Sequence, residues 1–453
     1  MICINEFKNQ NISAFSLKEK MNSHSECEIR INIGDADHTD FLNHLGKTLS
    51  IENGREFVFR GIIDRLTEEK RYSGNILTVH SVSQSIKTDT QKHKRIFQDP
   101  DKKLSDIIDF IDRRYGGRDG IKLCGEDKKI TKCVIQKDET DFEFLNRLAR
   151  ENGYRTIVRS DDSNIDILVG EYNNYSNVID LEDKKEYCEK IEISDIYESG
   201  TSVDLVLRDD PYSYIPLGRK IRYNEKYYYV DSLAIAMERS TYKYKYVLFE
   251  TDNKVQISDS DFPLIMLKGN VSNTDDPEHK GRIQVRFDCD YDEVKSDRLA
   301  WIPVETPYTA SKGGIYFIPD VNDRVDVKYI NGQLYASMSF GSKEIDRKFQ
   351  NTSDKYISNV NGKWIGLKEN SLEICSGDNV SITLNDNDIK LKVKDTSIIL
   401  SDNEIKVNIK GTNITLSDRV EAKCSGDIVV KANNISQKAS AAMEIRGSKI
   451  ELN

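Results

Sequence analysis

The chain has 453 residues, a formal net charge of −10 and a pI near 5.4, which argues against a surface that binds nucleic acid or an anionic membrane. A hydrophobic content of 38% with 31% charged residues is polar for a globular protein but well short of disorder. The length predicts about three domains, and the apolar runs are too short to span a bilayer.

The cysteines and the N-terminus bear on the cellular compartment. The eight cysteines are scattered singly and form no C-x-x-C pair, so we expect reduced thiols rather than a disulfide framework or a zinc site. The first residues, MICINEFKNQ, lack a basic stretch followed by an apolar one. We therefore predict synthesis in the cytoplasm without a signal peptide.

Residues 1–255 alternate between strand patterns and a helical stretch. Strand alternation is clear in EFVFRGIIDRL and NILTVHSVSQS, whereas two segments between about 100 and 155 carry helical spacing. In the second of these, Thr140 and Glu143 form a capping box, and Gly153 ends the helix. This pattern predicts β-barrels with a helical insertion. The first helix has its apolar face at Leu104, Ile107, Ile108 and Ile111, and the second at Phe142, Leu145 and Leu148.

Residues 262–342 contain short strand patterns separated by turn residues. GRIQVRFDCD alternates, and LAWIPVETPY, GGIYFIPDVNDRVDVKYING and LYASMSFGS supply further strands. Five or so short strands in about 80 residues predict a small barrel of the oligonucleotide/oligosaccharide-binding (OB) type. A polar segment, residues 343–365, follows as a predicted connector.

Residues 366–453 contain an internal repeat of sixteen residues. The segments 381–396, 397–412 and 413–428 align without gaps, so that Leu384, Leu400 and Leu416 correspond. Apolar residues occupy every second position, and each unit is two short strands with a polar turn. Asp386 and its equivalents Asp402 and Asp418 mark those turns. Repeated β-units must stack, because one unit cannot bury its own apolar face.

The apolar face of this segment must be buried against another surface. A sixteen-residue period is short for a single-chain β-helix, so we expect three copies of the chain to wind about one axis, with an ordinary β-sandwich as the alternative. The tip would carry Ile450 and Leu452. The expected trimer contacts are Ile382, Leu384, Ile389, Leu391, Val393, Ile398, Leu400, Ile405, Val407, Ile409, Ile414 and Leu416.

Three segments resemble the hub-and-spike family of contractile injection machines, which includes VgrG proteins of type VI secretion and gpD-like late-control spikes of phage tails. KRIFQDPDKKLSDII (94–108) is similar to the family's R-x-F-Q stretch, and CVIQKDETDFEFLNRLARENGY (133–154) to its long E-T-D-F-E-F-L signature. KGRIQVRFDCDYDE, with the segment 300–333, resembles the spike's OB domain, although Asn322 stands where the family usually has glycine.

The resemblance implies a mainly β fold: hub β-barrels with a helical insertion, an OB-fold barrel and a C-terminal intertwined triple-stranded β-helix in a homotrimer. It implies that residues 1–255 form a hub that seats a hexameric tail-tube protein, and that residues 366–453 form a needle that punctures a target membrane. Other implied partners are baseplate proteins and a PAAR-like tip protein. The protein would be assembled into a particle or secretion apparatus and expelled.

The sequence offers no catalytic, cofactor-binding or metal-binding residues that we would assign, and we expect a structural protein that is not an enzyme. GKTLS (46–50) lacks the first glycine of a phosphate-binding loop, and GDADHTD (34–40) lacks the pattern of an EF-hand. Two alternatives remain open: a β-helical polysaccharide-degrading tail enzyme, which would need carboxylates in a groove with aromatic platforms, and an adhesin fibre. Within the repeat region, aromatic residues stop at Trp364.

Overall fold

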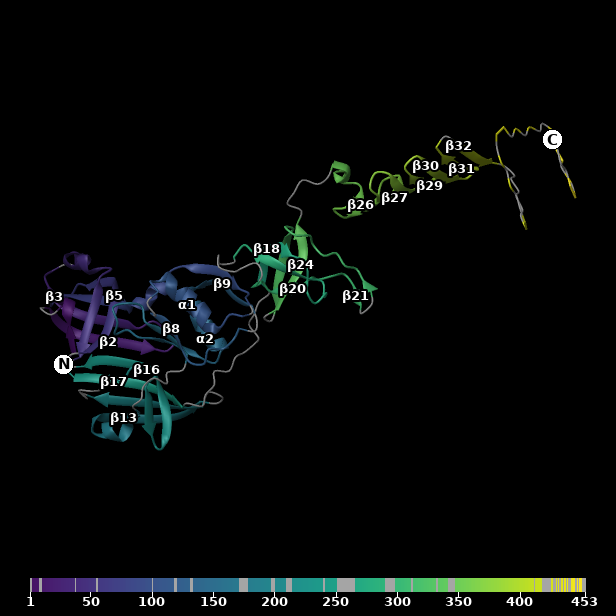
Figure 1. Cartoon of the computed structure of the whole chain (residues 1–453). Coiled ribbons are helices and arrows are strands. Elements are labelled where there is room, and N and C mark those ends of the chain that lie inside the picture. Colours follow the sequence, from purple (N-terminus) through teal and green to yellow (C-terminus); the bar gives the residue numbers. More distant parts are fainter. Residues whose placement is uncertain are drawn as a thin grey trace. The chain divides into compact units, whose positions relative to one another are not determined.

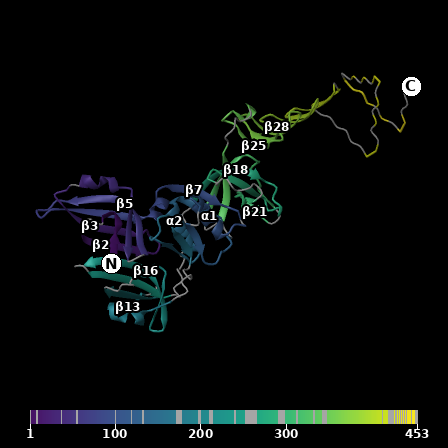
Figure 2. The same cartoon turned by 60° about the vertical axis from the view of Figure 1, so that its left-hand side comes forward.

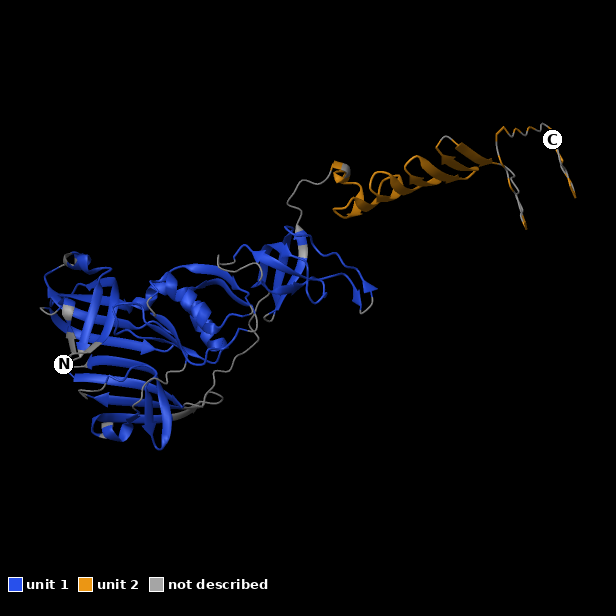
Figure 3. Cartoon of the chain, viewed as in Figure 1, with its two compact units in different colours: residues 1–342 blue, residues 343–453 orange. Residues whose placement is uncertain are grey.

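The computed structural model describes residues 2–7, 10–36, 38–53, 56–99, 101–117, 120–130, 133–170, 178–196, 200–208, 214–238, 241–250, 265–289, 298–310, 313–330, 333–340, 347–410 and 412–417, with scattered positions between 425 and 449. The chain divides into two compact units, Met1–Ser342 and Lys343–Asn453 (Figure 3). Among the described residues, no helix combines the length and the apolar content that crossing a membrane requires.

Barrel 1 (residues 2–83) is a curved sheet with the strand order β4-β5-β6-β3-β2, and β1 pairs with β4. Alternate residues point to its core, as in β3, where Cys27, Ile29 and Ile31 are buried. The elements are β1 (Ile2–Ile4), η1 (Asn5–Phe7), β2 (Asn11–Lys20), β3 (Glu26–Gly34), η2 (His38–His44), β4 (Thr48–Asn53), β5 (Glu56–Glu69) and β6 (Asn75–Ser83).

Barrel 2 (residues 179–250) repeats the order of the five main strands, although its short first strand, β12, pairs parallel with β15 whereas β1 pairs antiparallel with β4. Its order is β15-β16-β17-β14-β13, with β12 paired to β15, so β13 to β17 correspond in chain order to β2 to β6. A short 3-10 helix precedes the first long strand in both barrels. The elements are β12 (Ile179–Asp180), η4 (Leu181–Tyr187), β13 (Cys188–Ile196), β14 (Gly200–Arg208), β15 (Lys220–Tyr223), β16 (Lys226–Glu238) and β17 (Thr241–Glu250).

The two barrels also share their strand registers. The β5–β6 ladder skips Asp64 at a bulge, and the β16–β17 ladder skips Asp231; the pairs on either side of the two bulges correspond one to one. The β2–β3 ladder has a bulge just after Ile12, and the β13–β14 ladder has one just after Cys188. A common register with common bulges indicates an internal duplication of one barrel.

One short sequence match accompanies the duplication. Leu45–Lys47 reads Leu-Gly-Lys and leads into β4, and Leu217–Arg219 reads Leu-Gly-Arg and leads into the equivalent strand β15. Their glycines have φ of 76° and 77°, and each glycine N–H donates to a carbonyl 2.8 Å away, that of Ile63 or Val230. A positive φ favours glycine. The GKTLS segment therefore begins with a tight glycine turn that leads into β4.

The two barrels meet along an antiparallel pairing of β2 with β16 (Figures 1 and 2). This pairing makes one sheet of the strands of both barrels, and a single core of buried residues runs through them. Main-chain hydrogen bonds, rather than side-chain contacts alone, thus hold the barrels together.

The predicted helical insertion is confirmed and lies between the two barrels in the sequence. In α2 the Thr140 hydroxyl accepts from the Glu143 N–H at 3.1 Å, and the Glu143 carboxylate accepts from the Thr140 N–H at 2.9 Å, which is the expected capping box. The predicted apolar faces of both helices are buried. The elements are η3 (Gln84–Asp89), β7 (Lys92–Phe97), α1 (Leu104–Arg114), β8 (Ile121–Cys124), β9 (Val134–Thr140), α2 (Asp141–Glu151), β10 (Arg155–Val158) and β11 (Ile167–Gly170).

The OB barrel contains a five-stranded sheet in the order β20-β19-β18-β23-β24. Its core includes Ile283, Val285 and Phe287, the residues whose alternation predicted the strand. Asn322 adopts φ of 72°, so it takes the backbone conformation that glycine supplies in the family pattern. The strands are β18 (Ile265–Asn273), β19 (Arg282–Phe287), β20 (Trp301–Pro303), β21 (Thr309–Ala310), β22 (Gly313–Gly314), β23 (Arg324–Ile330) and β24 (Gln333–Phe340).

The second unit carries an eight-stranded antiparallel meander, here called the ribbon, in which each strand pairs with the next. Its first strand lies inside 343–365, the predicted connector, and its second strand begins there, because Ile357 and Ile365 extend the apolar alternation into that polar segment. After η7 (Arg347–Phe349), the strands are β25 (Lys355–Ser358), β26 (Lys363–Leu367), β27 (Ser371–Ser376), β28 (Val380–Asn385), β29 (Asp388–Val393), β30 (Thr396–Ser401), β31 (Glu404–Ile409) and β32 (Thr412–Ser417).

Candidate functional site

The ribbon places its apolar residues in continuous rows across the strands. One row runs through residues that are directly opposite one another in successive pairs: Ile357, Ile365, Ile374, Ile382, Leu391, Ile398, Val407 and Ile414. A second row, two residues along each strand, contains Leu367, Leu372, Leu384, Ile389, Leu400, Ile405 and Leu416. Residues two apart point to the same side of a sheet, so both rows share one face, the apolar face of the ribbon.

This face is open in the single chain. Ten of the twelve expected trimer contacts are between 37% exposed, as for Ile398, and 55% exposed, as for Val393. The opposite face is mainly polar: Lys390 and Lys406 flank Ile399 in the register. A contiguous exposed apolar surface of this kind marks an interaction site.

The turns of the ribbon follow the sixteen-residue repeat. Asp386 and Asp402 lie in the turns after β28 and β30, as predicted, and in the first of these the Asn385 amide donates to the Asp388 carboxylate at 2.7 Å. At the other edge, Lys394 and its equivalent sixteen residues on, Lys410, adopt φ of 52° and 41°. Asp418 and the predicted tip residues lie outside the described residues.

An aromatic cluster closes the start of the ribbon. Trp364 packs edge to face against Tyr356 and Phe349, with ring centroids 5.8 and 6.2 Å apart. Gly366 lies under these rings, where a Cβ would come within 2.8 Å of the Trp364 and Tyr356 side chains. The cluster gives the first strands a small core of their own.

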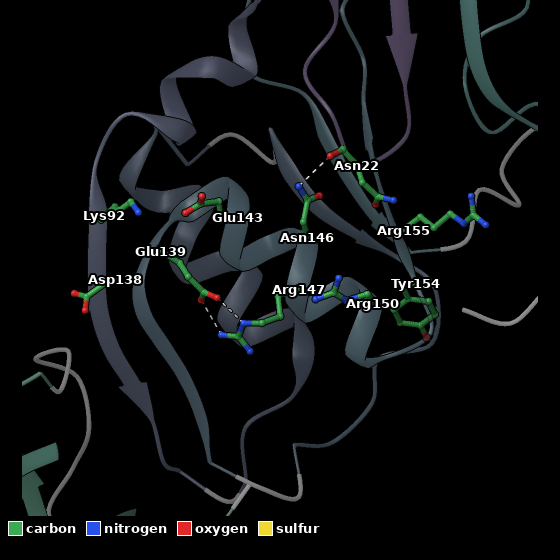
Figure 4. Close-up of a pocket in the computed structure, with 10 residues that line it drawn as sticks. All are labelled: Asn22, Lys92, Asp138, Glu139, Glu143, Asn146, Arg147, Arg150, Tyr154 and Arg155. Atoms are coloured by element: carbon green, nitrogen blue, oxygen red, sulfur yellow. Dashed lines mark hydrogen bonds and ion pairs between the residues drawn. The ribbon is translucent and has the colours of Figure 1, made fainter. Parts of the chain in front are cut away.

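A polar pocket of about 720 Å³ lies beside α2 (Figure 4). Arg147 donates to Glu139 at 2.7 Å and to Glu151 at 2.7 Å, so the most buried guanidinium of the wall is already neutralised. Within the described residues, no group of three His, Cys, Asp or Glu side chains could hold a metal ion. The lining residues are Asn22, Lys92, Asp138, Glu139, Glu143, Asn146, Arg147, Arg150, Tyr154 and Arg155.

One constellation that the sequence did not predict is a Ser–His–Asp arrangement. The His24 ring is 2.7 Å from the Ser85 hydroxyl through Nδ1 and 3.3 Å from the Asp89 carboxylate through Nε2. Ser85 is only 1% exposed, and the ring stacks on Phe142 at 3.9 Å. Burial lowers the pKa of His24. A buried hydroxyl has no access for a substrate, so the arrangement ties barrel 1 to α2.

A buried carboxyl also lies beside the joint between the barrels. Glu19 of β2 accepts hydrogen bonds from the hydroxyls of Ser160 and of Tyr214, the latter at 3.1 Å. Burial raises the pKa of Glu19 to about 7, against the effect of these hydrogen bonds. The group is therefore about half protonated at pH 7 and mostly protonated at lower pH.

Glu19→Gln is expected to abolish a pH dependence of the stability of the barrels. A carboxyl whose pKa is raised in the folded state stabilises the fold below its unfolded pKa and loses that contribution as the pH rises through about 7. Between pH 4.5 and pH 8.5, the free energy of unfolding of the wild type should fall by roughly 3 kcal/mol more than that of Glu19→Gln. Thermal unfolding across that range measures this, with the exposed Glu26→Gln as control; parallel curves for wild type and Glu19→Gln would contradict it.

Two family models match the chain. The model described as phage tail baseplate hub (GPD) matches residues 18–227. The model described as type VI secretion system/phage-baseplate injector OB domain matches residues 267–342. No curated protein matches the chain.

Solved structures agree with the fold. The E. coli c3393 protein, described as a component of the type VI secretion system similar to the T4 bacteriophage tail proteins gp27 and gp5, aligns with a TM-score of 0.54 and 14% identity over 74% of this chain and 99% of that chain. The Francisella PdpA–VgrG complex in its half-lidded form aligns with a TM-score of 0.52 and 10% identity over 91% of this chain and 84% of that chain.

The hub match runs from the end of β2 through the rest of barrel 1 and the insertion to the start of β16 in barrel 2, and the injector match covers the OB barrel almost completely. Together the two matches cover more than half of the chain, in the order expected from the sequence. The protein therefore belongs to the baseplate hub-and-spike family of contractile injection machines, the family of the VgrG proteins and the gpD-like phage-tail spikes.

Proposed function

We propose that this hub-and-spike protein acts as a homotrimer whose three ribbons wind together into a needle. The apolar face of the ribbon is the observation that supports this, because two unbroken rows of Ile, Leu and Val lie open on a single chain. The contacts at the axis would be made by the twelve residues from Ile382 to Leu416 named above. Ile450 and Leu452 would be the last apolar steps toward the tip.

The energetics favour association. Covering the remaining exposed area of a half-exposed aliphatic side chain gains roughly 0.5–1 kcal/mol, so a dozen per chain gain about 10 kcal/mol. Three chains together gain roughly 30 kcal/mol, which is at or above the roughly 8–30 kcal/mol of translational and rotational freedom lost in the two association steps that form a trimer. The ribbon is also already hydrogen-bonded between its strands, so little further backbone ordering opposes association.

We assign the other parts of the chain the roles that the resemblance to the hub-and-spike family implies. We assign residues 1–255 to the hub, 262–342 to the OB domain, 343–365 to a connector whose second half already carries the first ribbon strand, and 366–453 to the needle. The hub would seat a hexameric tail-tube protein and contact baseplate proteins, because three copies of a duplicated barrel present six similar units. The needle, with a PAAR-like protein at its tip, would puncture the target envelope.

We further propose that the protein is structural and not an enzyme. Arg147 and Arg155 on the wall of the described pocket are already ion-paired, and the hydroxyl-bearing Ser85 of the Ser–His–Asp arrangement is buried. The polysaccharide-degrading alternative needs aromatic platforms, and the ribbon has its aromatic residues only at its start. The protein would be made in the cytoplasm and expelled with the apparatus.

Deletion of the protein in its source cell tests this function. We expect that assembled tubes and contracted sheaths disappear from cell lysates viewed by electron microscopy, and that the wild-type gene restores them. Tubes of normal number and length without the protein would contradict the proposal. Release of sugars from an envelope polysaccharide by the purified protein would favour the enzyme instead.

A further inference from the structure

Residues 21–25, the turn between β2 and β3, fasten barrel 1 to the insertion, and we call this turn the clasp. The Asn22 N–H donates to the Thr156 carbonyl of β10 at 2.8 Å, and the Asn22 side-chain oxygen accepts from the Thr156 N–H at 2.8 Å. From α2, the Asn146 amide donates to the Asn22 carbonyl at 3.2 Å. Two elements of the insertion are therefore held by one residue of barrel 1.

A buried carboxyl precedes the clasp. Glu19 is 3% exposed, and the hydroxyls of Ser160 and Tyr214 donate to it. The Ser160 hydroxyl also lies 3.4 Å from the Val58 carbonyl. When Glu19 is protonated, its O–H can donate to Ser160, whose own hydroxyl then donates to Val58. The neutral acid therefore satisfies more of these groups than the carboxylate does.

A largely buried imidazole lies within the clasp. His24 Nδ1 is 2.7 Å from the Ser85 hydroxyl, and the ring stacks on Phe142 of α2 at 3.9 Å. In the neutral ring, Nδ1 can accept from Ser85, and the Ser83 hydroxyl, 2.8 Å from Ser85, can donate to Ser85 in turn. Protonation makes Nδ1 a donor, so the Ser85 hydroxyl loses this acceptor. The neutral form of His24 therefore fits the closed clasp.

The two side chains exchange protons in opposite senses when the clasp closes. Burial raises the pKa of Glu19 to about 7, and burial lowers the pKa of His24. Closing therefore takes up a proton at Glu19 and releases one at His24. The Glu19 contribution weakens the closed clasp as the pH rises from about 4.3 to about 7, whereas the His24 contribution strengthens it as the pH rises toward about 6.5.

The neighbouring charges do not account for these opposite senses. Asp161 raises the pKa of Glu19, and Asp89 and Glu26 act to raise that of His24, so the carboxylates favour the protonated form of both groups. The opposite senses come from burial, which favours the neutral form of each. The other groups at these places are Leu233 of β16 opposite Glu19, and the Arg155–Asp231 ion pair with Lys20, next to the Met21 N–H, which donates to the Asp231 carbonyl.

We propose that Glu19 and His24 form a compensating pair that keeps the insertion docked on the clasp between about pH 5 and 6.5. In this range the proton taken up at one side chain is matched by the proton released at the other, so the net uptake on docking stays near zero. A buried acid alone, or a buried imidazole alone, would make docking change with pH. The proposed function gives a reason for the pair, because a protein that is expelled from its cell meets more than one pH.

Amide hydrogen exchange of the full-length protein tests the pair. The Asn22 and Thr156 amides report opening of the clasp, and dividing the exchange rate of an unstructured peptide at each pH by the measured rate gives their protection. In the wild type, protection should change less than about threefold between pH 5 and 6.5. In Glu19→Gln it should rise about tenfold with pH over that range, and in His24→Gln it should fall about tenfold.

The variants and the wild type give independent outcomes. Opposite slopes in the two single variants, with a nearly flat profile when Glu19→Gln and His24→Gln are combined, would support the pair. Slopes of the same sign, or flat profiles in both single variants, would overturn it. A change of about tenfold or more in the wild type would also overturn it, even if neither variant folds. Amides of β19 in the OB barrel are the internal control, since their protection should be the same in every variant.

Discussion

Ile398→Glu is expected to convert the trimer into monomers at neutral pH. Ile398 lies in the middle of the first apolar row, opposite Leu391 and Val407. In the proposed needle, three copies of residue 398 converge on the axis, and each buried carboxylate costs several kcal/mol. The loss of roughly 10 kcal/mol per trimer cancels a large part of the association energy. Light scattering on the purified full-length variant measures the mass.

Ile399→Glu is the matched control for this substitution. It introduces the same side chain one residue away, on the opposite face, between Lys390 and Lys406. The trimer should persist, since the new carboxylate meets two cations at the surface. If both variants were monomers, or both were trimers, the assignment of the apolar face of the ribbon to the trimer axis would be contradicted. Lowering the pH below about 4 should restore the Ile398→Glu trimer, because protonation removes the buried charge.

Asp141→Ala is expected to destabilise the helical insertion by about 3–5 kcal/mol. The Asp141 side chain is fully buried and accepts from Arg95 at 2.6 Å, from Tyr115 at 2.8 Å and from Gln136 at 2.9 Å. Burial alone would raise its pKa, but these donors lower it. Removal of the carboxylate leaves the Arg95 guanidinium, which is 8% exposed, as an uncompensated buried charge. Denaturant unfolding followed by the near-UV signal of the insertion measures the loss.

Asp101→Ala provides the comparison for this prediction. Asp101 forms an ion pair with Lys129 at 2.9 Å, but both side chains are more than half exposed. An exposed ion pair is screened by water and contributes little to stability, so this variant should unfold almost as the wild type does. Equal losses from the two substitutions would contradict the role of burial. Asp141 lies in the E-T-D-F-E-F-L segment, and its contacts give a structural reason for an aspartate at that position.

Local features were predictable from the sequence. The capping box at Thr140 and the apolar faces of both helices depend on neighbours within a few residues, and they are confirmed. The turns of the ribbon were also predictable, because the sixteen-residue repeat fixes where each pair of strands reverses. In such cases spacing along the chain determines the contact.

The duplication of the barrels was not predictable in the same way. Few equivalent positions are alike in sequence, such as Leu45–Lys47 with Leu217–Arg219 and the bulge residues Asp64 and Asp231, so the duplication shows mainly in the strand pairing. The contacts of His24 with Ser85 and Asp89 join residues more than sixty positions apart, so no local sequence pattern predicts them. The sequence predicts a connector where β25 and the start of β26 lie, because polar residues surround the few apolar ones there.

The mass of the purified full-length chain at nanomolar concentration tests the central claim most directly. Mass photometry should give particles of three times the 51.9 kDa chain, because the apolar faces of the ribbons are covered only in an assembly. A folded single chain at that dilution, with the strand signal of the ribbon intact by circular dichroism, would contradict the account.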